Sequence, residues 1–354
     1  MTQPDDLTFM LRCLDLARMA EGQTAPNPMV GAVVVHDGVI IGEGYHLKAG
    51  TPHAEVHAIR SVSDSFLLPT STLYVSLEPC SHHGRTPPCT DLIISSGIPR
   101  VVIGTADTSP KVAGKGIARL REAGLEVVTG VAENECRMVN RRFFTWHEKQ
   151  RPYVIMKWAR SADGFIDLVR QPVDAVEPHW ITGVAERILV HRWRAAEDAI
   201  LAGGGTVRAD NPSLTVRLWE GKNPLRIIVS RSGVMDKGSK VFDRSVDTIL
   251  FTCSNNINIP GVRVIKLADN EHFVREILTV LHSMGVQSLF VEGGAFIIRS
   301  FVEEGCWDEA RRFTGLARFG GGVADSFTEF TPQKSVHFEK SILEFMYHFP
   351  VNCV

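Results

Sequence analysis

The sequence predicts an α/β protein made of two layered domains. The chain has 354 residues, of which 44% are hydrophobic, and this length suits two ordinary domains better than one. Short β-branched runs alternate with segments of helical periodicity in both halves. A polar, basic segment followed by Pro152 separates the halves. We therefore assign residues 1–147 to a first domain and 148–354 to a second.

The first half predicts the element order α-β-β-α-β-α-β-α-β. Apolar residues at helical spacing mark the opening helix, and two β-branched runs around the Asp37-Gly38 pair indicate a β-hairpin. Helices and strands then alternate, which predicts one sheet of about five strands in an α/β layer. The expected helices span residues 7–20, 53–62, 89–96 and 116–123, and the expected strands span 30–35, 39–45, 72–77, 100–106 and 125–130.

The second half also mixes strands and helices, and it does not repeat the first. The tail after residue 315 predicts only a last strand at 342–349. The other expected strands span residues 153–159, 198–203, 225–230, 248–252 and 288–294, and the expected helices span 184–195 and 271–284.

Composition and charge exclude several classes of protein. With 38 basic and 40 acidic side chains the net charge is -2, which gives no bulk attraction to nucleic acid or to an anionic membrane. No apolar run approaches the roughly 20 residues that span a bilayer, and the acidic N-terminus is unlike a signal peptide. Seven cysteines without a secretory signal indicate reduced thiols or metal ligands. We expect a cytoplasmic homo-oligomer that acts on a small molecule, without nucleic-acid or membrane partners.

Two short motifs supply the donors of a catalytic metal site. TPHAEVH places His53 two residues before Glu55, and LEPCSHHGRTPPC places Cys80 and Cys89 just after a predicted strand. One imidazole and two thiolates leave the fourth tetrahedral position of Zn²⁺ for water, although iron or cobalt also accepts such donors. Glu55 would then carry protons.

This order, His-x-Glu followed by Pro-Cys, is that of the zinc nucleobase deaminases. Here eight residues rather than two separate the cysteines. A chance His-x-Glu together with buried structural cysteines is the alternative explanation.

The segments around these donors resemble the deaminase half of the RibD family of bifunctional riboflavin-biosynthesis proteins. The resemblance rests on APNPMVGAVVV (25–35), GEGYHLKAGTPHAE (42–55) and YVSLEPCSHHGRTPPC (74–89), and it covers nearly all of residues 5–147. It implies a cytidine-deaminase-like fold and hydrolytic loss of the 2-amino group from 2,5-diamino-6-(5-phosphoribosylamino)pyrimidin-4-one. It also implies that zinc binds His53, Cys80 and Cys89, that Glu55 is the proton donor and that Asn27 lies at the substrate.

Other polar residues near the ligands are candidates for binding the phosphorylated substrate. Asn27 lies between two prolines, which restrict its loop, although a turn-forming asparagine is an equal alternative. We expect His46 and Arg85 to contact the substrate, with solvated loop residues as the alternative. His82 and His83 are further candidates of the same kind, whereas His57 is interpreted as structural.

The second half resembles the reductase half of the same family, whose fold is like that of dihydrofolate reductase. The matching segments are MKWARSADGFID (156–167), HWITG (179–183), DAILAGGGTVRADNPSLTVR (198–217), LRIIVS (225–230) and LFVEGG (289–294). The resemblance implies reduction of the ribosyl side chain to ribityl by NADPH. Hydride delivery to an imine-like C1′ needs a well-positioned nicotinamide and no covalent motif.

Two glycine clusters, 203–205 and 293–294, follow predicted strands, where backbone N–H groups can approach a pyrophosphate. Ordinary turns are the alternative, and the absence of GxGxxG argues against a Rossmann unit. Arg217 has the fork of donors that matches phosphate, with a surface salt bridge as its alternative. Carried over from the family, the cofactor contacts are Trp180, Thr206 and Asp210, joined by Gly293 and Gly294, and the substrate contacts are Leu214, Arg217 and Glu292.

The leading hypothesis is therefore an enzyme that deaminates and then reduces consecutive intermediates of flavin synthesis. A deaminase of another nucleoside or RNA base fused to an unrelated reductase is a second hypothesis, disfavoured by the long loop between the cysteines and by the near-neutral charge. A non-catalytic binding protein is a third, and it predicts the loss of Glu55 or of a ligand, none of which is missing.

Overall fold

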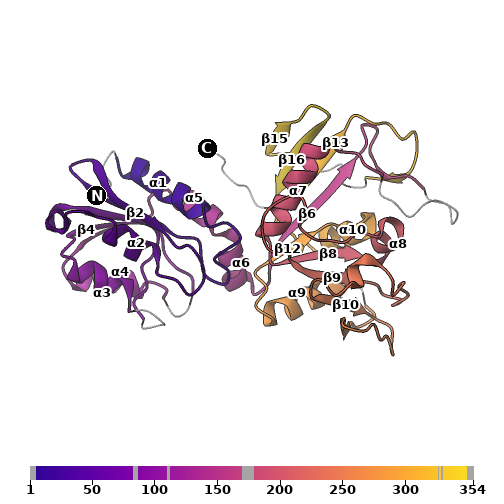
Figure 1. The fold of residues 1–354 in the computed structure, drawn as a ribbon, viewed down its shortest axis with the longest axis horizontal. Helices are drawn as coiled ribbons and strands as arrows, with labels where there is room; N and C mark the ends of the chain where they lie inside the picture. Colours follow the sequence, from indigo (N-terminus) through magenta and orange to yellow (C-terminus); the bar gives the residue numbers. More distant parts are fainter. Residues whose placement is uncertain are drawn as a thin grey trace. The chain divides into compact units, whose positions relative to one another are not determined.

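The computed structural model of the chain divides into two compact units, Met1–Gln150 and Arg151–Val354, each drawn in Figure 1. The boundary predicted after residue 147 falls inside helix α6 (Arg141–Lys149), which ends at Gln150 in a left-handed conformation. Each unit has its own sheet and its own apolar core. The structure describes residues 5–82, 87–109, 112–169, 179–270, 272–325, 327 and 330–348.

A five-stranded sheet in the order β2-β1-β3-β4-β5 forms the centre of the first unit. The hairpin β1–β2 and the pair β1–β3 are antiparallel, and β3, β4 and β5 run parallel. The elements are α1 (Asp6–Arg18), β1 (Gly31–His36), β2 (Val39–Tyr45), α2 (Ala54–Arg60), the 3-10 helix η1 (Ser65–Thr70), β3 (Thr72–Leu77), α3 (Cys89–Ser95), β4 (Arg100–Thr105), α4 (Lys115–Glu122), β5 (Glu126–Thr129), α5 (Glu133–Val139) and α6.

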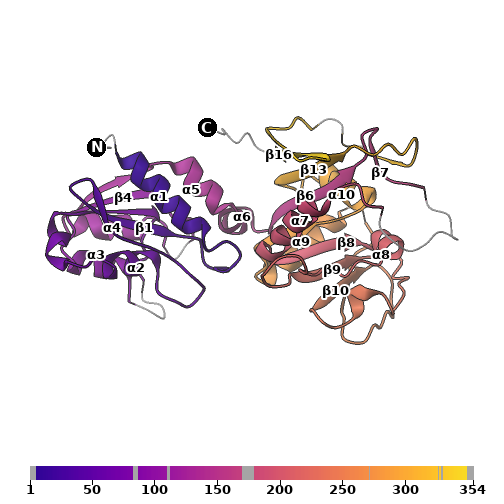
Figure 2. The same cartoon turned by 45° about the horizontal axis from the view of Figure 1, so that its top comes forward.

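Helices cover both faces of this sheet, as Figure 2 shows. Alternate strand residues point to opposite faces, so Val33 packs against α1 and α5 in one core, and Val34 packs against α2, α3 and α4 in the other. Every helix and strand predicted for the first half is present. Helices α5 and α6 were not predicted, because their few buried residues, Cys136 and Phe143 among them, stand between many charged ones.

The second unit contains a nine-stranded sheet in the order β11-β10-β9-β8-β12-β6-β13-β16-β15. Its pairs are parallel from β11 to β13, and β16 and β15 add an antiparallel edge. The elements are β6 (Tyr153–Arg160), β7 (Phe165–Asp167), α7 (Val184–Ala196), β8 (Ala199–Gly203), α8 (Gly204–Asp210), β9 (Leu225–Val229), η2 (Lys240–Phe242), β10 (Thr248–Thr252), β11 (Arg263–Lys266), α9 (Phe273–Ser283), β12 (Ser288–Val291), α10 (Ala295–Glu303), β13 (Glu309–Gly315), β14 (Val323–Ala324), β15 (Lys334–His337) and β16 (Ser341–Tyr347).

The predicted strands and helices of this half are present, with one difference at the site. The strand expected to reach residue 294 ends at Val291, so the following residues form the turn into α10. Helices α9 and α10 pack on one face of the sheet, and α7 and α8 pack on the other. Among the described residues, none of the helices has the length and apolar character needed to cross a membrane.

Candidate active sites of the two units

The three predicted metal ligands meet where α2 and α3 begin. His53 is the N-cap residue of α2, Cys89 is the first residue of α3, and Cys80 lies in the loop after β3. Nδ1 of His53 is 3.5 Å from Sγ of Cys80 and 3.3 Å from Sγ of Cys89. The three donor atoms lie within 4.8 Å of one another. Nitrogen and sulfur ligands of a tetrahedral zinc are about 3.6 Å apart, so this donor set fits zinc.

The two thiols differ in acidity. A hydrogen bond from the Cys89 side chain, with a further contribution from His53, lowers the pKa of Cys80 to about 4. The backbone N–H of Cys89 also donates to Sγ of Cys80 over 3.4 Å. The same Cys80–Cys89 hydrogen bond, together with burial, raises the pKa of Cys89. The geometry therefore favours a thiolate at Cys80, which is the form in which a cysteine would bind a metal.

Glu55 lies in the first turn of α2 and is 3% exposed. Burial raises the pKa of its carboxyl group, and the charge on His53 opposes this rise. A carboxyl group with a raised pKa can both accept and release a proton near neutral pH. Glu55 is thus suited to carry protons beside the three donors.

Asn27 and His46 contact each other next to the donors. Nδ2 of Asn27 is 3.1 Å from Nε2 of His46, and Nδ1 of His46 is 3.1 Å from the carbonyl oxygen of Pro52. The His46 ring meets the His53 ring edge to face, with centroids 5.4 Å apart. The predicted substrate contact Arg85 and the candidate His83 lie outside the described residues, and His82 is exposed.

His57 is not part of the donor cluster and packs instead against Gly44 of β2. A Cβ atom on Gly44 would lie only 2.3 Å from Cβ of His57. Glycine is therefore required at this point for α2 to approach the hairpin. This close packing agrees with the structural interpretation of His57.

Glu78 organises the metal-ligand loop, and the sequence reasoning did not single it out. Its buried carboxylate accepts hydrogen bonds from the backbone N–H groups of Asp107 (3.1 Å), Gly114 (3.0 Å), Gly116 (2.9 Å) and Ile117 (3.2 Å). Because Glu78 stands two residues before Cys80, these bonds tie the ligand loop to the start of α4. The sequence feature that could have identified Glu78 is its position in LEPC, directly before the Pro-Cys pair.

Two further residues beside this site were also missed. Asp107 follows β4, and burial raises its pKa to about 6. Asn140, between α5 and α6, holds the backbone of Met29 through its side-chain amide, accepting from the Met29 N–H over 2.8 Å and donating to its carbonyl over 2.9 Å. No local pattern marks Asn140, because its partner is 111 residues away.

In the second unit, two glycine-containing turns converge where α8 and α10 begin, on the neighbouring strands β8 and β12 (Figure 1). A Cβ atom on Gly294 would lie 3.2 Å from Oγ1 of Thr206. A Cβ atom on Gly203 or Gly293 would lie 2.8 Å from the side chain of Ile297. Glycine thus allows the two turns to approach, and the helix starts present backbone N–H groups there.

Arg194 and Glu292 form a buried ion pair through two hydrogen bonds of 2.6 and 2.9 Å. Burial alone would raise the pKa of Glu292, but the Arg194 guanidinium outweighs it and lowers this pKa to about 2. Lys157 on β6 is within reach of the same charges: burial lowers its pKa, while Glu292 and Asp210 oppose this. The sequence predicted Glu292 but missed Arg194, which lies in an ordinary helical pattern.

Arg217 belongs to the same charged cluster. Its backbone N–H donates to Nδ1 of His191 over 2.9 Å, and its guanidinium donates to Oγ1 of Thr215 over 2.8 Å. Burial, together with the charge on Arg194, lowers the pKa of Arg217. Leu214 is 2% exposed and has a positive φ of 51°. The structure therefore places Arg217 and Glu292 in one electrostatic environment.

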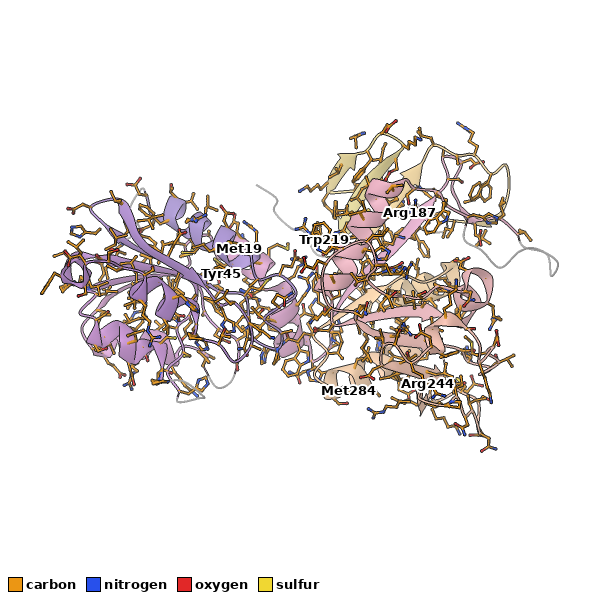
Figure 3. All side chains as sticks on the ribbon, viewed as in Figure 1. Met19, Tyr45, Arg187, Trp219, Arg244 and Met284 are labelled. Carbon is orange, nitrogen blue, oxygen red and sulfur yellow. The ribbon has the colours of Figure 1, made fainter. Side chains whose placement is uncertain are left out.

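Trp180 is 62% exposed, and the guanidinium of Arg187 lies 4.5 Å from the centre of its ring. Figure 3 labels Arg187 on α7, together with Trp219, which stacks with Arg192 of the same helix at 5.6 Å. Two exposed tryptophans thus flank α7 next to arginines. Only Trp180 was predicted to contact a cofactor.

Comparison with known proteins covers both units. Residues 3–105 match the family model of the cytidine and deoxycytidylate deaminase zinc-binding region, and residues 152–343 match that of the RibD C-terminal domain. Riboflavin biosynthesis protein RibD of Bacillus amyloliquefaciens is 41% identical over 327 residues, which cover 90% of this chain and 86% of that protein. RibD of Aquifex aeolicus is 41% identical over 326 residues, which cover 90% and 89%.

A solved structure from Thermotoga maritima, described as a diaminohydroxyphosphoribosylaminopyrimidine deaminase/5-amino-6-(5-phosphoribosylamino)uracil reductase, superposes with a TM-score of 0.86 at 40% identity. The superposition covers 97% of this chain and 98% of that one. These matches confirm the predicted fold class, a deaminase-like N-terminal unit followed by a RibD-type reductase unit. The chain therefore belongs to the RibD family and is a bifunctional deaminase and reductase of riboflavin biosynthesis.

Proposed function

We propose that the first unit hydrolyses the 2-amino group from 2,5-diamino-6-(5-phosphoribosylamino)pyrimidin-4-one. In the next step the second unit reduces the ribosyl side chain with NADPH and forms 5-amino-6-(5-phosphoribitylamino)uracil. The observation that carries the proposal is the cluster of His53, Cys80 and Cys89 with buried Glu55 beside it. The name of the similar Thermotoga protein, which specifies both activities, supports the same substrates.

In the deaminase unit, His53, Cys80 and Cys89 are the residues that would hold zinc. A zinc ion bound there supplies a nucleophilic water at neutral pH. Glu55 carries two protons from the attacking water in turn: the first goes to a ring nitrogen and stays there, and the second goes to the 2-amino group, which leaves as ammonia. Asn27 binds the pyrimidine through its side-chain amide. Burial of Glu55 raises the pKa of its carboxyl group above the ordinary value, which favours its holding a proton between the two transfers.

In the reductase unit, the converging turns at Thr206 and at 293–294 are suited to the cofactor pyrophosphate. NADPH held there would supply a hydride for C1′ of the open-chain imine. Arg217 binds the substrate phosphate, because its planar guanidinium matches phosphate oxygens. Glu292, held in place by Arg194, orients the sugar hydroxyls. The remaining assignments are Trp180 and Asp210 to the cofactor and Leu214 to the substrate.

The test separates the two activities in the full-length protein. Glu55→Gln should release no ammonia from the diaminopyrimidine but should still oxidise NADPH with the already deaminated compound. Arg217→Gln should show the reverse: normal ammonia release, and a KM for the deaminated compound raised at least tenfold. Glu122→Gln, at an exposed position on α4, and Arg263→Gln, at an exposed position on β11, are the matched controls.

Two results would contradict the assignments. Ammonia release that survives in Glu55→Gln removes Glu55 from the deaminase mechanism. NADPH oxidation that never occurs with the deaminated compound removes the proposed activity of the second unit.

A further inference from the structure

The loop that carries Asn27 is held in place on two sides. Asn140, which is 2% exposed, fixes both backbone polar groups of Met29. The backbone N–H of His46 donates to the carbonyl oxygen of Val30 over 2.9 Å. The backbone N–H of Asn27 itself donates to the Thr24 carbonyl over 2.8 Å. With the main chain fixed, what Asn27 offers to a ligand depends on the orientation of its side-chain amide.

His46 determines that orientation. The Pro52 carbonyl oxygen can only accept a hydrogen bond, so Nδ1 of His46, 3.1 Å away, must carry a proton. In the neutral ring Nε2 is then an acceptor. The Asn27 group that lies 3.1 Å from Nε2 must therefore be the amide nitrogen, which donates to it. The other end of the amide, Oδ1, is left to accept a hydrogen bond from a ligand.

The contacts of His46 also connect it to His53, one of the three metal donors. Pro52, the acceptor for His46, directly precedes His53 in the chain. The rings of His46 and His53 are also in edge-to-face contact. His46 itself is 2% exposed, and both of its nitrogens bond to protein atoms. The imidazole has no remaining polar atom with which to contact a substrate.

We infer that His46 is a positioning residue, not the substrate contact expected from the sequence, and that it presents Oδ1 of Asn27 as a hydrogen-bond acceptor. The site thereby selects a pyrimidine with an N–H or O–H donor at this point. A site built around a hydrogen bond rejects a ligand that cannot form it. The inference rests on the proposed function, because it takes Asn27 to contact the pyrimidine.

Three substitutions in the zinc-loaded, full-length protein distinguish the effects of the two hydrogen bonds of the His46 ring, one with Asn27 and one with Pro52. The end of a glutamine side chain reaches the region of Nε2, so His46→Gln can still accept from Asn27. The shorter His46→Asn can replace only the bond to Pro52, and His46→Phe replaces neither. For ammonia release, we expect His46→Gln to lose no more than about threefold in kcat/KM. His46→Asn and His46→Phe should each lose at least tenfold in kcat/KM, mainly through a higher KM. In both variants the Asn27 amide has no acceptor at Nε2 and is free to rotate.

A double substitution tests whether His46 acts through Asn27. Once Asn27→Ala is present, His46→Asn should cause no further loss, because coupled residues are not additive. Additive losses, or equal activity in His46→Asn and His46→Gln, would overturn the inference. Zinc content and NADPH oxidation with the deaminated compound should remain at the wild-type level in every variant, which excludes misfolding as the cause.

A readout without activity keeps this inference separate from the proposed function. In protein labelled with ¹⁵N-histidine, the ring shifts of His46 report which nitrogen carries the proton. We expect the tautomer protonated at Nδ1, and the tautomer protonated at Nε2 would overturn the inference whatever the activity. If the expected tautomer is found but Asn27→Ala does not change the KM, the assignment of Asn27 to the substrate fails, and the positioning role of His46 fails with it.

Discussion

Arg194 is the residue on which the charge of Glu292 depends. Removing the guanidinium leaves a buried carboxylate without its partner, which typically costs about 3 kcal/mol of unfolding free energy. We therefore expect Arg194→Gln to destabilise the second unit by about that amount and to raise the KM for the deaminated compound. Urea unfolding followed by tryptophan fluorescence measures the first effect, because most of the tryptophans lie in this unit. Arg231→Gln, which breaks an exposed pair with Asp269, should cost less than about 0.5 kcal/mol.

The Arg194–Glu292 ion pair also makes the stability of the second unit depend on pH. The pKa of Glu292 is lowered to about 2 in the folded chain, below its ordinary value near 4.5. The stability that this carboxylate contributes is therefore complete above pH 4.5 and is lost as the pH falls towards 2. In Arg194→Gln this part of the acid dependence should be absent. An unchanged acid dependence in the variant would show that another group causes it.

His191 gives a second pH dependence, at a higher pH. Burial and the charges on Arg194 and Arg217 lower its pKa to about 4, below the ordinary 6.5. As the pH falls from 6.5 to 4, the unfolded chain takes up a proton that the folded chain does not, so stability is lost over this range. His191→Asn keeps an acceptor for the Arg217 N–H and cannot titrate. Between pH 7 and 4, the free energy of unfolding of His191→Asn should fall by about 2 kcal/mol less than that of the wild type. Urea unfolding at the two pH values measures this difference.

Single residues could be predicted where a short motif contains all the chemistry. His53, Glu55, Cys80 and Cys89 lie in two contiguous segments whose donor types already indicate zinc. Arg194 could not be found in this way, because it acts on a partner 98 residues away. The spacing of residues along the chain does not encode such a contact, which exists only after the sheet has formed.

At the scale of elements, the start of α4 fixes the position of the ligand loop. A Cβ atom on Gly116 would lie 2.0 Å from the carbonyl oxygen of Pro79, so Gly116→Ala must displace the peptide that leads into Cys80. We expect zinc content and ammonia release to fall at least tenfold, while NADPH oxidation with the deaminated compound is unchanged. Glu122→Ala, on the exposed side of α4, should change neither activity. Full zinc content in Gly116→Ala would contradict this account.

Strand β13 was missed because its charged residues are buried. Strand β13 has the polar sequence EARRFTG, yet almost all of it is buried. Arg311 bonds to Glu309 on the same strand at 2.7 Å, and Arg312 bonds to Glu344 of β16 at 2.8 Å. Alternating apolar residues indicate a strand. A run of charged residues has the sequence pattern of a loop, even when the charges are paired inside the protein. Strands β8 and β12, which have a conventional apolar pattern, were predicted, whereas the short β11 was not.

For the whole molecule, the two separate cores lead to a prediction about fragments. Residues 1–150 and 151–354 expressed separately should each fold, the first releasing ammonia and the second oxidising NADPH. A fragment that ends at residue 147 should be less stable, because it removes the end of α6 and the hydrogen bond from Gln150 to the His147 carbonyl. Circular dichroism during heating compares the three fragments. A fragment 1–150 that does not fold would show that the first unit needs the second.

The central position of β6 also has a consequence for synthesis on the ribosome. β6 opens the second unit, but its partners β12 and β13 are translated only near the end, since Tyr153 pairs with Ser288 and Ile155 with Glu309. At ordinary elongation rates the nascent chain carries this apolar strand unpaired for on the order of ten seconds. The first unit can fold during that interval, whereas the second must wait for the last strands to emerge. Premature termination would thus release a folded deaminase attached to an aggregation-prone remnant.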